Sequence, residues 1–198
     1  RDNRGLNQTV GLSAQICFTN QPSSPNCFGS LTSADLKLNL QASLGRPAIL
    51  ANPGQALVQY ESSFGRAQES KVACCLFLDN HVYGGVTFRQ RLWRGANNIV
   101  GAWGHMPLAW PVPHELEGRD CWCGRNGCLE GFLSLSGLEN EYFNTTQTKL
   151  NIKLIADAAD ANDLVAASVL QVLDDRIGRA TAAIINMFDP DVIVLGGR

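Results

Sequence analysis

The stretch from Asp163 to Gly197, DLVAASVLQVLDDRIGRATAAIINMFDPDVIVLGG, decides the fold class of this chain. Its apolar residues recur every three or four positions, which predicts a helix with one apolar face, capped by Asn162 or Asp163. The helix should end at Phe188, because the segment DPD interrupts the pattern. Four apolar residues in succession, VIVL, follow and are typical of a strand covered on both faces. A helix, a short turn and a buried strand predict an α/β fold.

The rest of the chain supplies the other elements of such a fold. We expect a strand over 10–19, a helix from Ser33 or Asp35 to Leu44, a strand over 48–51, a helix over 55–64, a strand over 72–78 and a returning strand over 82–93 that completes a hairpin. The helix over 55–64 is expected to bury a face formed by Ala56, Leu57, Tyr60 and Phe64.

The composition is that of a globular protein with nearly balanced charge. The 198 residues are 45% hydrophobic, and 16 Lys and Arg against 18 Asp and Glu give a net charge of -2. This balance provides no basic field for phosphates, so we expect neither a nucleic-acid nor a membrane partner. The first residues, RDNRG, form no signal peptide, and the chain stops directly after a predicted buried strand. We therefore expect a fragment of a longer chain.

Seven cysteines, an odd number, cannot all pair within the chain. Disulfide scaffolds are shorter and richer in cysteine, so a cytoplasmic, reducing environment fits this sequence better. Cys74 and Cys75 lie inside an apolar run, where we expect them to act as small hydrophobic residues of a strand.

The other notable cysteines lie within eight residues, at Cys121, Cys123 and Cys128 in CWCGRNGC. Three converging thiolates repel one another unless a cation neutralises them, and zinc is the usual choice inside cells. The alternative is three unrelated buried thiols beside a core histidine. We expect a structural zinc that orders an irregular loop over 95–135.

His105 is the expected fourth ligand, because it lies in the same irregular region as the cysteines. His114 is closer in sequence but sits among prolines and a glutamate, and His81 belongs to another segment. Four protein ligands leave no open position for water, which is why the predicted role is structural.

Several segments together resemble one known family. CWCGRNGCLE, which ends at Glu130, and GAWGHMPL at 101–108 resemble the signature of the ROK family (repressors, open reading frames and kinases). LGRP at 44–47, LWRGAN at 92–97 and DPDVIVLGG at 189–197 extend the likeness over nearly the whole chain. The stretch WGHMPLAW makes the bacterial fructokinases of the family the nearest likeness.

The resemblance implies the actin-like ATPase or sugar-kinase fold (ribonuclease H-like), with two α/β lobes and substrate between them. It implies one partial domain over 1–198, which is mostly the second lobe. The first, nucleotide-binding lobe would be largely absent, and the helix–strand unit over 160–198 would be truncated. Members transfer the γ-phosphate of ATP, with Mg²⁺, to a hexose hydroxyl, or sense sugars as repressors. They are commonly dimers, which implies a homodimer here.

The resemblance also assigns the sugar site. The catalytic base of the family, the aspartate of an NDAN stretch, aligns with Pro53, and proline has no acid–base chemistry, so we expect no catalytic residue. Asn52, His105 and Glu130 resemble residues that contact the sugar in relatives, and His105 would serve as zinc ligand as well. A family carboxylate is replaced by Ala102, which removes one sugar contact.

The expected nucleotide contacts are Gly84, Gly85, Gly196 and Gly197. The family's phosphate loop, GTGxGGG, aligns with DNHVYGG at 79–85, so only its last two glycines remain. Asp79 brings negative charge and Tyr83 brings bulk where the backbone should approach phosphates. The family resemblance therefore implies ATP and Mg²⁺ as cofactors, whereas the residues of this loop disfavour their binding.

These departures predict a sugar kinase-like protein that has lost phosphoryl transfer, with fructose the first expected hexose and glucose or mannose the alternatives. A non-catalytic sugar-binding or repressor-type member is a second hypothesis, and a zinc-stabilised structural remnant is a third. In the third, Glu130 is a helix-capping or solvated carboxylate. Arg119 is expected to be solvated.

Overall fold

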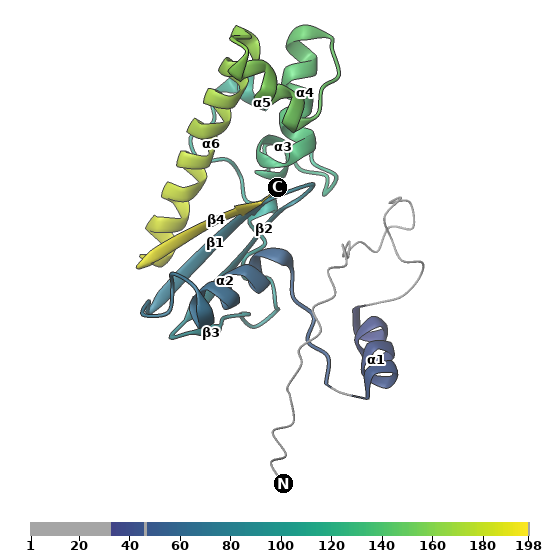
Figure 1. Ribbon diagram of the computed structural model, residues 1–198, viewed down its shortest axis with the longest axis vertical. Coiled ribbons are helices and arrows are strands. Elements are labelled where there is room, and N and C mark those ends of the chain that lie inside the picture. The colour runs from purple at the N-terminus through teal and green to yellow at the C-terminus, as the bar shows by residue number, and fades with distance from the viewer. Residues whose placement is uncertain (1–32, 46, 198) are drawn as a thin grey trace. The chain divides into compact units, whose positions relative to one another are not determined.

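The computed structural model of the chain describes residues 33–45 and 47–197 (Figure 1). The strand expected over 10–19 lies outside these residues. The described residues up to Ala51 belong to one compact unit, and those from Asn52 onward to a second.

The first unit contains the predicted helix and lacks the predicted strand. Helix α1 (Ser33–Leu44) is followed directly by Gly45, which terminates it. Gly45 has a φ of +61°, a value that glycine adopts without steric cost. The strand expected over 48–51 is wrong: these residues belong to no strand, and Ile49 is 80% exposed. An apolar run forms a strand only where another strand supplies its hydrogen bonds, and none of the described strands pairs with this one.

The second unit is built on a four-stranded sheet in the order β3-β2-β1-β4. Its strands are β1 (Val72–Leu78), β2 (Val82–Phe88), β3 (Arg91–Leu92) and β4 (Val192–Gly197). β1 and β2 form the predicted antiparallel hairpin, and β4 runs parallel to β1. The returning strand is shorter than predicted, because Arg89 and Gln90 adopt positive φ and turn the chain into β3.

Helices cover both faces of this sheet, which confirms the predicted α/β layering (Figure 1). Cys74 and Leu76 of β1 pack in a core with Ile184 of the long C-terminal helix, and Ala73 and Cys75 pack with Val58 on the opposite face. The adjacent cysteines thus point to opposite sides, both fully buried. Burial raises the pKa of the Cys74 thiol to about 11 and that of Cys75 to about 12, as expected of inert core residues.

Helix α2 (Pro53–Phe64) buries a different face from the one predicted. Tyr60 and Phe64 are exposed, and the buried face consists of Gly54, Gln55, Val58 and Ser62. Small and polar residues pack here because their polar groups are satisfied: the hydroxyls of Ser62 and Thr87 lie 2.7 Å apart in a buried hydrogen bond.

The C-terminal part is helical. Its helices are α3 (Glu130–Leu133), α4 (Leu135–Thr146), α5 (Ile152–Asp160) and α6 (Leu164–Phe188). Asp163 caps α6 by accepting hydrogen bonds from two backbone N–H groups, as predicted. Helices α4 and α5 were not predicted, although Ser134 and Asn151 are suitable N-caps that begin them. Among residues 33–45 and 47–197, no helix combines the length and apolar character needed to cross a bilayer.

Candidate functional site

The cysteine loop is folded by its own backbone. Cys121 N–H donates to Arg125 O at 2.7 Å, and Gly127 N–H donates to Arg119 O at 3.1 Å. Gly124 and Gly127 have φ of +86° and +79°, a conformation that favours glycine and closes these turns. Two further bonds, Leu108 N–H to Gly127 O and Leu129 N–H to Met106 O, hold the loop against the segment that contains His105.

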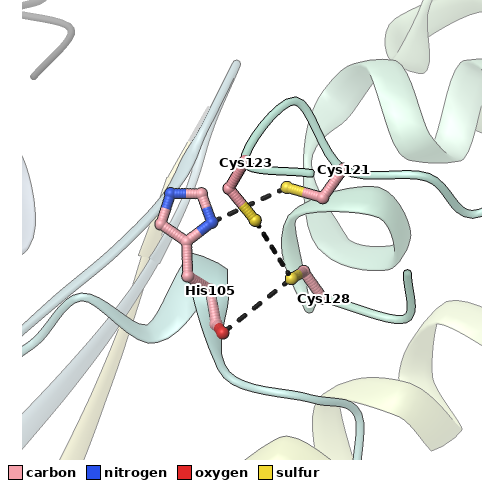
Figure 2. A group of neighbouring side chains, drawn as sticks. All are labelled: His105, Cys121, Cys123 and Cys128. Carbon is pink, nitrogen blue, oxygen red and sulfur yellow. Dashed lines mark hydrogen bonds between the residues drawn. The ribbon is translucent and has the colours of Figure 1, made fainter. Parts of the chain in front are cut away.

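This folding brings together the four predicted metal ligands. The ligand atoms of His105, Cys121, Cys123 and Cys128 all lie within 4.8 Å of one another. His105 Nδ1 is 3.6 Å from Cys121 Sγ, and Cys123 Sγ is 3.7 Å from Cys128 Sγ (Figure 2). Cys121 and Cys128 are buried, whereas Cys123 is exposed. Such a group of one imidazole and three thiols can hold a metal ion.

His105 is positioned by a short 3-10 helix, Trp103–His105, that packs against β2. Trp103 anchors this turn, since its indole Nε1–H donates to the buried Cys75 O at 2.7 Å. The ring of Trp122 contacts the His105 ring edge-on, with centroids 4.7 Å apart. His105 is thus fixed between the sheet and the cysteine loop.

Glu130 lies next to this centre, at the first turn of α3, and is buried. Its Oε1 accepts a short hydrogen bond from His81 Nδ1–H, and its Oε2 accepts from Val82 N–H at 2.9 Å. Gly104 leaves room for this carboxylate, because a Cβ there would lie 2.6 Å from Oε2. The hydrogen bond to Glu130 raises the pKa of His81. The contact with His81 has no sequence signal, because the two residues are 49 positions apart.

Asn52 and Pro53 begin α2. Asn52 Oδ1 accepts a hydrogen bond from Gln55 N–H at 2.7 Å, and Gln55 Oε1 accepts one from Asn52 N–H. The two residues thus form a capping box at the start of the helix. Pro53 follows as the first helical residue, where its missing N–H costs nothing. In the described part of the chain, no hydrogen bond joins Asn52 to His105 or Glu130.

The four glycines expected to contact nucleotide are packed against protein atoms. A Cβ on Gly84 would lie 1.6 Å from Trp103 Nε1, and one on Gly85 would lie 2.7 Å from Gln55 Cα. On β4, a Cβ on Gly196 would meet Leu57 at 2.4 Å, and one on Gly197 would meet Leu78 O at 2.0 Å. Their observed role is close packing within the fold, and nucleotide contact stays a prediction.

A buried charge network supports the cysteine loop from the helical side. Arg119, predicted to be solvated, is instead partly buried, with 11% of its side chain exposed: it donates to Gly131 O at 2.8 Å and forms an ion pair with Glu141. Arg176 of α6 bonds both Glu141 and Glu115, at 2.7 and 3.1 Å. The sequence holds a signal for this network, because Arg176 falls on the apolar stripe of α6, where an unpaired charge would be costly.

Comparison with known proteins gives relatives of two kinds. A family model described as the ROK family matches residues 18–198. The xylose repressor of Bacillus subtilis (strain 168) is 27% identical over 161 residues, 81% of this chain and 40% of the repressor. An N-acetylgalactosamine kinase of Shewanella sp. (strain ANA-3) is 28% identical over 156 residues, 78% of this chain and 51% of the kinase. The chain thus spans about half the length of such relatives, or less.

Solved structures share the fold. The ROK hexokinase of Thermus thermophilus matches with a TM-score of 0.73 and 28% identity, over 82% of this chain and 54% of that one. A ROK glucokinase of Streptomyces griseus, in complex with glucose and AMPPNP, matches with a TM-score of 0.73 and 26% identity, over 88% and 59%. The α/β architecture described above is therefore that of the sugar-kinase, or actin-like ATPase, fold, and the chain belongs to the ROK family.

Proposed function

We propose that this chain is a hexose-binding module of the ROK family that does not transfer phosphate. The observation that carries this proposal is the start of α2, where Pro53 occupies the position that the family resemblance gives to the catalytic base. Loss of a general base typically costs about 10²- to 10⁴-fold in rate. Asp79 offers no replacement, because it lies in the turn between β1 and β2, at the start of the stretch that aligns with the family's phosphate loop, rather than beside Asn52 at the start of α2.

The chain keeps three of the residues that the family resemblance assigns to sugar binding: Asn52, His105 and Glu130. Each oxygen of Glu130 accepts one protein hydrogen bond, and a carboxylate oxygen can accept a second one from a sugar hydroxyl. His105 and the free amide of Asn52 are the other proposed contacts. The similarity to a glucokinase in complex with glucose and to xylose repressors supports a sugar as the ligand in general. We propose fructose first, with glucose and mannose as alternatives.

ATP and Mg²⁺ are not part of the proposed function. The glycines that the family uses near phosphates are filled by neighbours here, Gly84 by Trp103 and Gly196 by Leu57. These glycines are also strand residues paired in register with β1, so they do not form an open loop of N–H groups around a polyphosphate. The chain covers 51% of the N-acetylgalactosamine kinase and 59% of the glucokinase.

The proposed metal is a structural zinc ion. Tetrahedral zinc with bonds of about 2.3 Å to sulfur and about 2.0 Å to nitrogen places neighbouring sulfurs about 3.8 Å apart, and sulfur and nitrogen about 3.5 Å apart. The distances of 3.7 Å between Cys123 and Cys128 and of 3.6 Å between His105 and Cys121 fit these values. With four protein ligands the ion would order the loop and leave no position for water.

Thiol ligands and the free, buried Cys74 and Cys75 suit a reducing compartment, so we propose the cytoplasm. The homodimer implied by the family resemblance is a further proposal, which light scattering of the purified chain would test.

An assay of phosphoryl transfer tests the proposal directly. The zinc-loaded chain is incubated with Mg-ATP and fructose, glucose or mannose, and sugar phosphate is measured, with an active ROK glucokinase as positive control. We expect no sugar phosphate above the enzyme-free background. ATP-dependent phosphorylation that scales with the concentration of the chain would overturn the loss of catalysis.

A repressor origin is the second candidate, favoured by the similarity to xylose repressors. The sequence upstream of residue 1 would distinguish a repressor from a kinase. A helix-turn-helix there would indicate a repressor, and a glycine-rich DxGGT-like stretch would indicate a kinase.

A further inference from the structure

The hairpin turn between β1 and β2 carries a polar side chain that the family resemblance does not account for. His81 aligns with a glycine of the family's phosphate loop, yet in this structure it reaches the buried Glu130 at the start of α3. Its ring also contacts Tyr83 edge-on, with centroids 6.0 Å apart. His81 is thus held in place by two neighbours beside the carboxylate of the proposed sugar site.

The hydrogen bond to Glu130 uses only one nitrogen of the imidazole. Nδ1–H donates to Glu130 Oε1, and within residues 33–45 and 47–197 no hydrogen bond involves Nε2. The side chain keeps 24% of its surface exposed, so a ligand can reach it. A histidine whose ring is fixed through one nitrogen presents the other in a defined direction.

The charge around the ring favours a neutral partner. Glu130 and Asp79 both raise the pKa of His81, the first through its hydrogen bond and the second through its charge. The carboxylates of Glu130 and Asp79 therefore both lie close enough to act on the ring, which makes its surroundings unfavourable for an added anion. A phosphate group would be repelled by these carboxylates, whereas a hydroxyl, which both donates and accepts, can form a hydrogen bond with Nε2 without charge repulsion.

We propose that His81 is a ligand-contacting residue of the hexose site, fixed by Glu130 through Nδ1 and hydrogen-bonded through Nε2 to a hydroxyl of an unphosphorylated hexose. This inference rests on the proposed function, because Glu130 is the shared residue. It adds a contact from the hairpin turn and restricts the ligand to neutral sugars.

Two substitutions separate the two nitrogens. Asn places its amide near the position of Nδ1, so His81→Asn keeps the bond to Glu130 and removes the outer hydrogen-bonding group. Gln extends further, so His81→Gln places an amide near the position of Nε2. His114→Asn, at an exposed histidine elsewhere, is the control. Fructose, glucose, mannose and glucose 6-phosphate are titrated calorimetrically into each protein, with zinc content and melting temperature measured in parallel.

We expect the unaltered chain to bind a hexose, His81→Asn to bind it about tenfold more weakly, and His81→Gln to recover most of the loss. His114→Asn should match the unaltered chain, and glucose 6-phosphate should bind at least about tenfold more weakly than the hexose. Equal hexose affinity in His81→Asn, or tight binding of glucose 6-phosphate, overturns this inference and leaves the proposed function intact. Absence of hexose binding by the unaltered chain overturns both.

Discussion

Gly84 is the residue on which the close packing of α2, β2 and the His105 turn depends. Its Cα lies against Gly54 of α2, so that a Cβ added to Gly54 would come within 2.5 Å of it, whereas a Cβ added to Gly84 itself would lie 1.6 Å from Trp103 Nε1. Trp103 in turn precedes the metal-ligand candidate His105 by two residues. Because Gly84 has no side chain, Trp103 and the turn that holds His105 can lie close to the sheet.

Gly84→Ala is expected to lower the free energy of unfolding by about 3 kcal/mol, because the new methyl group must displace Trp103. Gly178→Ala is the matched control: it lies in the middle of α6 with no atom within 4 Å of an added Cβ, so it should stabilise by about 0.5 to 1 kcal/mol. Urea unfolding of both variants measures the difference. Equal stability of the two variants would contradict this packing.

Cys123 tests the metal centre at the same scale. Cys123→Ser removes one of four ligands, so we expect loss of bound zinc and unfolding of the loop over 95–135, since zinc binding supplies about 10 kcal/mol or more in small zinc peptides. Metal analysis and thermal melting of the purified chain report both effects. Cys74→Ala, a buried cysteine outside the centre, should keep one zinc per chain. An unchanged melting curve with full zinc content in Cys123→Ser would refute the zinc site.

At the scale of elements, the cysteine loop is tied to the helices by carboxylates that sit between arginines. Glu115 lies in a short 3-10 helix, Pro113–Leu116, and accepts from Arg179 at 2.7 Å and from Arg176 at 3.1 Å. These bonds, led by that from Arg179, lower the pKa of Glu115 to about 2. The ionised carboxylate is therefore a link between the loop and α6.

The lowered pKa predicts the sign of a pH dependence. A carboxyl group with a lower pKa in the folded than in the unfolded state stabilises above its unfolded value of 4.5, and that contribution is lost as pH falls towards 2. Glu115→Gln should lower the free energy of unfolding by about 2 to 3 kcal/mol at pH 6, and the deficit should shrink as pH falls from 4.5 to 2.5.

The matched control is Asp157→Asn, which breaks an exposed ion pair with Lys153 and should change stability by less than about 0.5 kcal/mol. Urea unfolding across this pH range compares both variants with the unaltered chain, which cancels any common loss of metal in acid. A deficit in Glu115→Gln that stays constant with pH would contradict the buried ion pair.

The elements also show where sequence patterns succeed and fail. Periodicity predicted α6 and β4, because a long apolar stripe and a continuous apolar run have few alternatives. It failed for α2, whose buried face is set by Gly54 and by hydrogen bonds of Gln55 and Ser62 rather than by large apolar residues. It failed again at 48–51, because strand formation depends on a partner strand that no local pattern reveals.

At the scale of the whole molecule, the candidate site is assembled from distant segments, and only part of it was predictable. The cluster of His105 with three cysteines was predictable, because the spacing of the cysteines and the nearby histidine is typical of a metal site. The pairing of His81 with Glu130 was not, because it depends on the hairpin lying against α3. Nor was the ion pair of the partly buried Arg119 with Glu141, since a charged residue does not reveal its partners before the fold is known.

The central claim is that this ROK-family chain retains a hexose site and lacks a working nucleotide site. The most direct measurement is isothermal titration of fructose, glucose and Mg-ATP into the zinc-quantified chain, at one temperature and buffer. The account predicts saturable binding of a hexose, no binding of ATP and one zinc per chain. Saturable ATP binding would contradict it, because the packed glycines would then have to open to a polyphosphate, and absence of binding by every sugar would refute the hexose site.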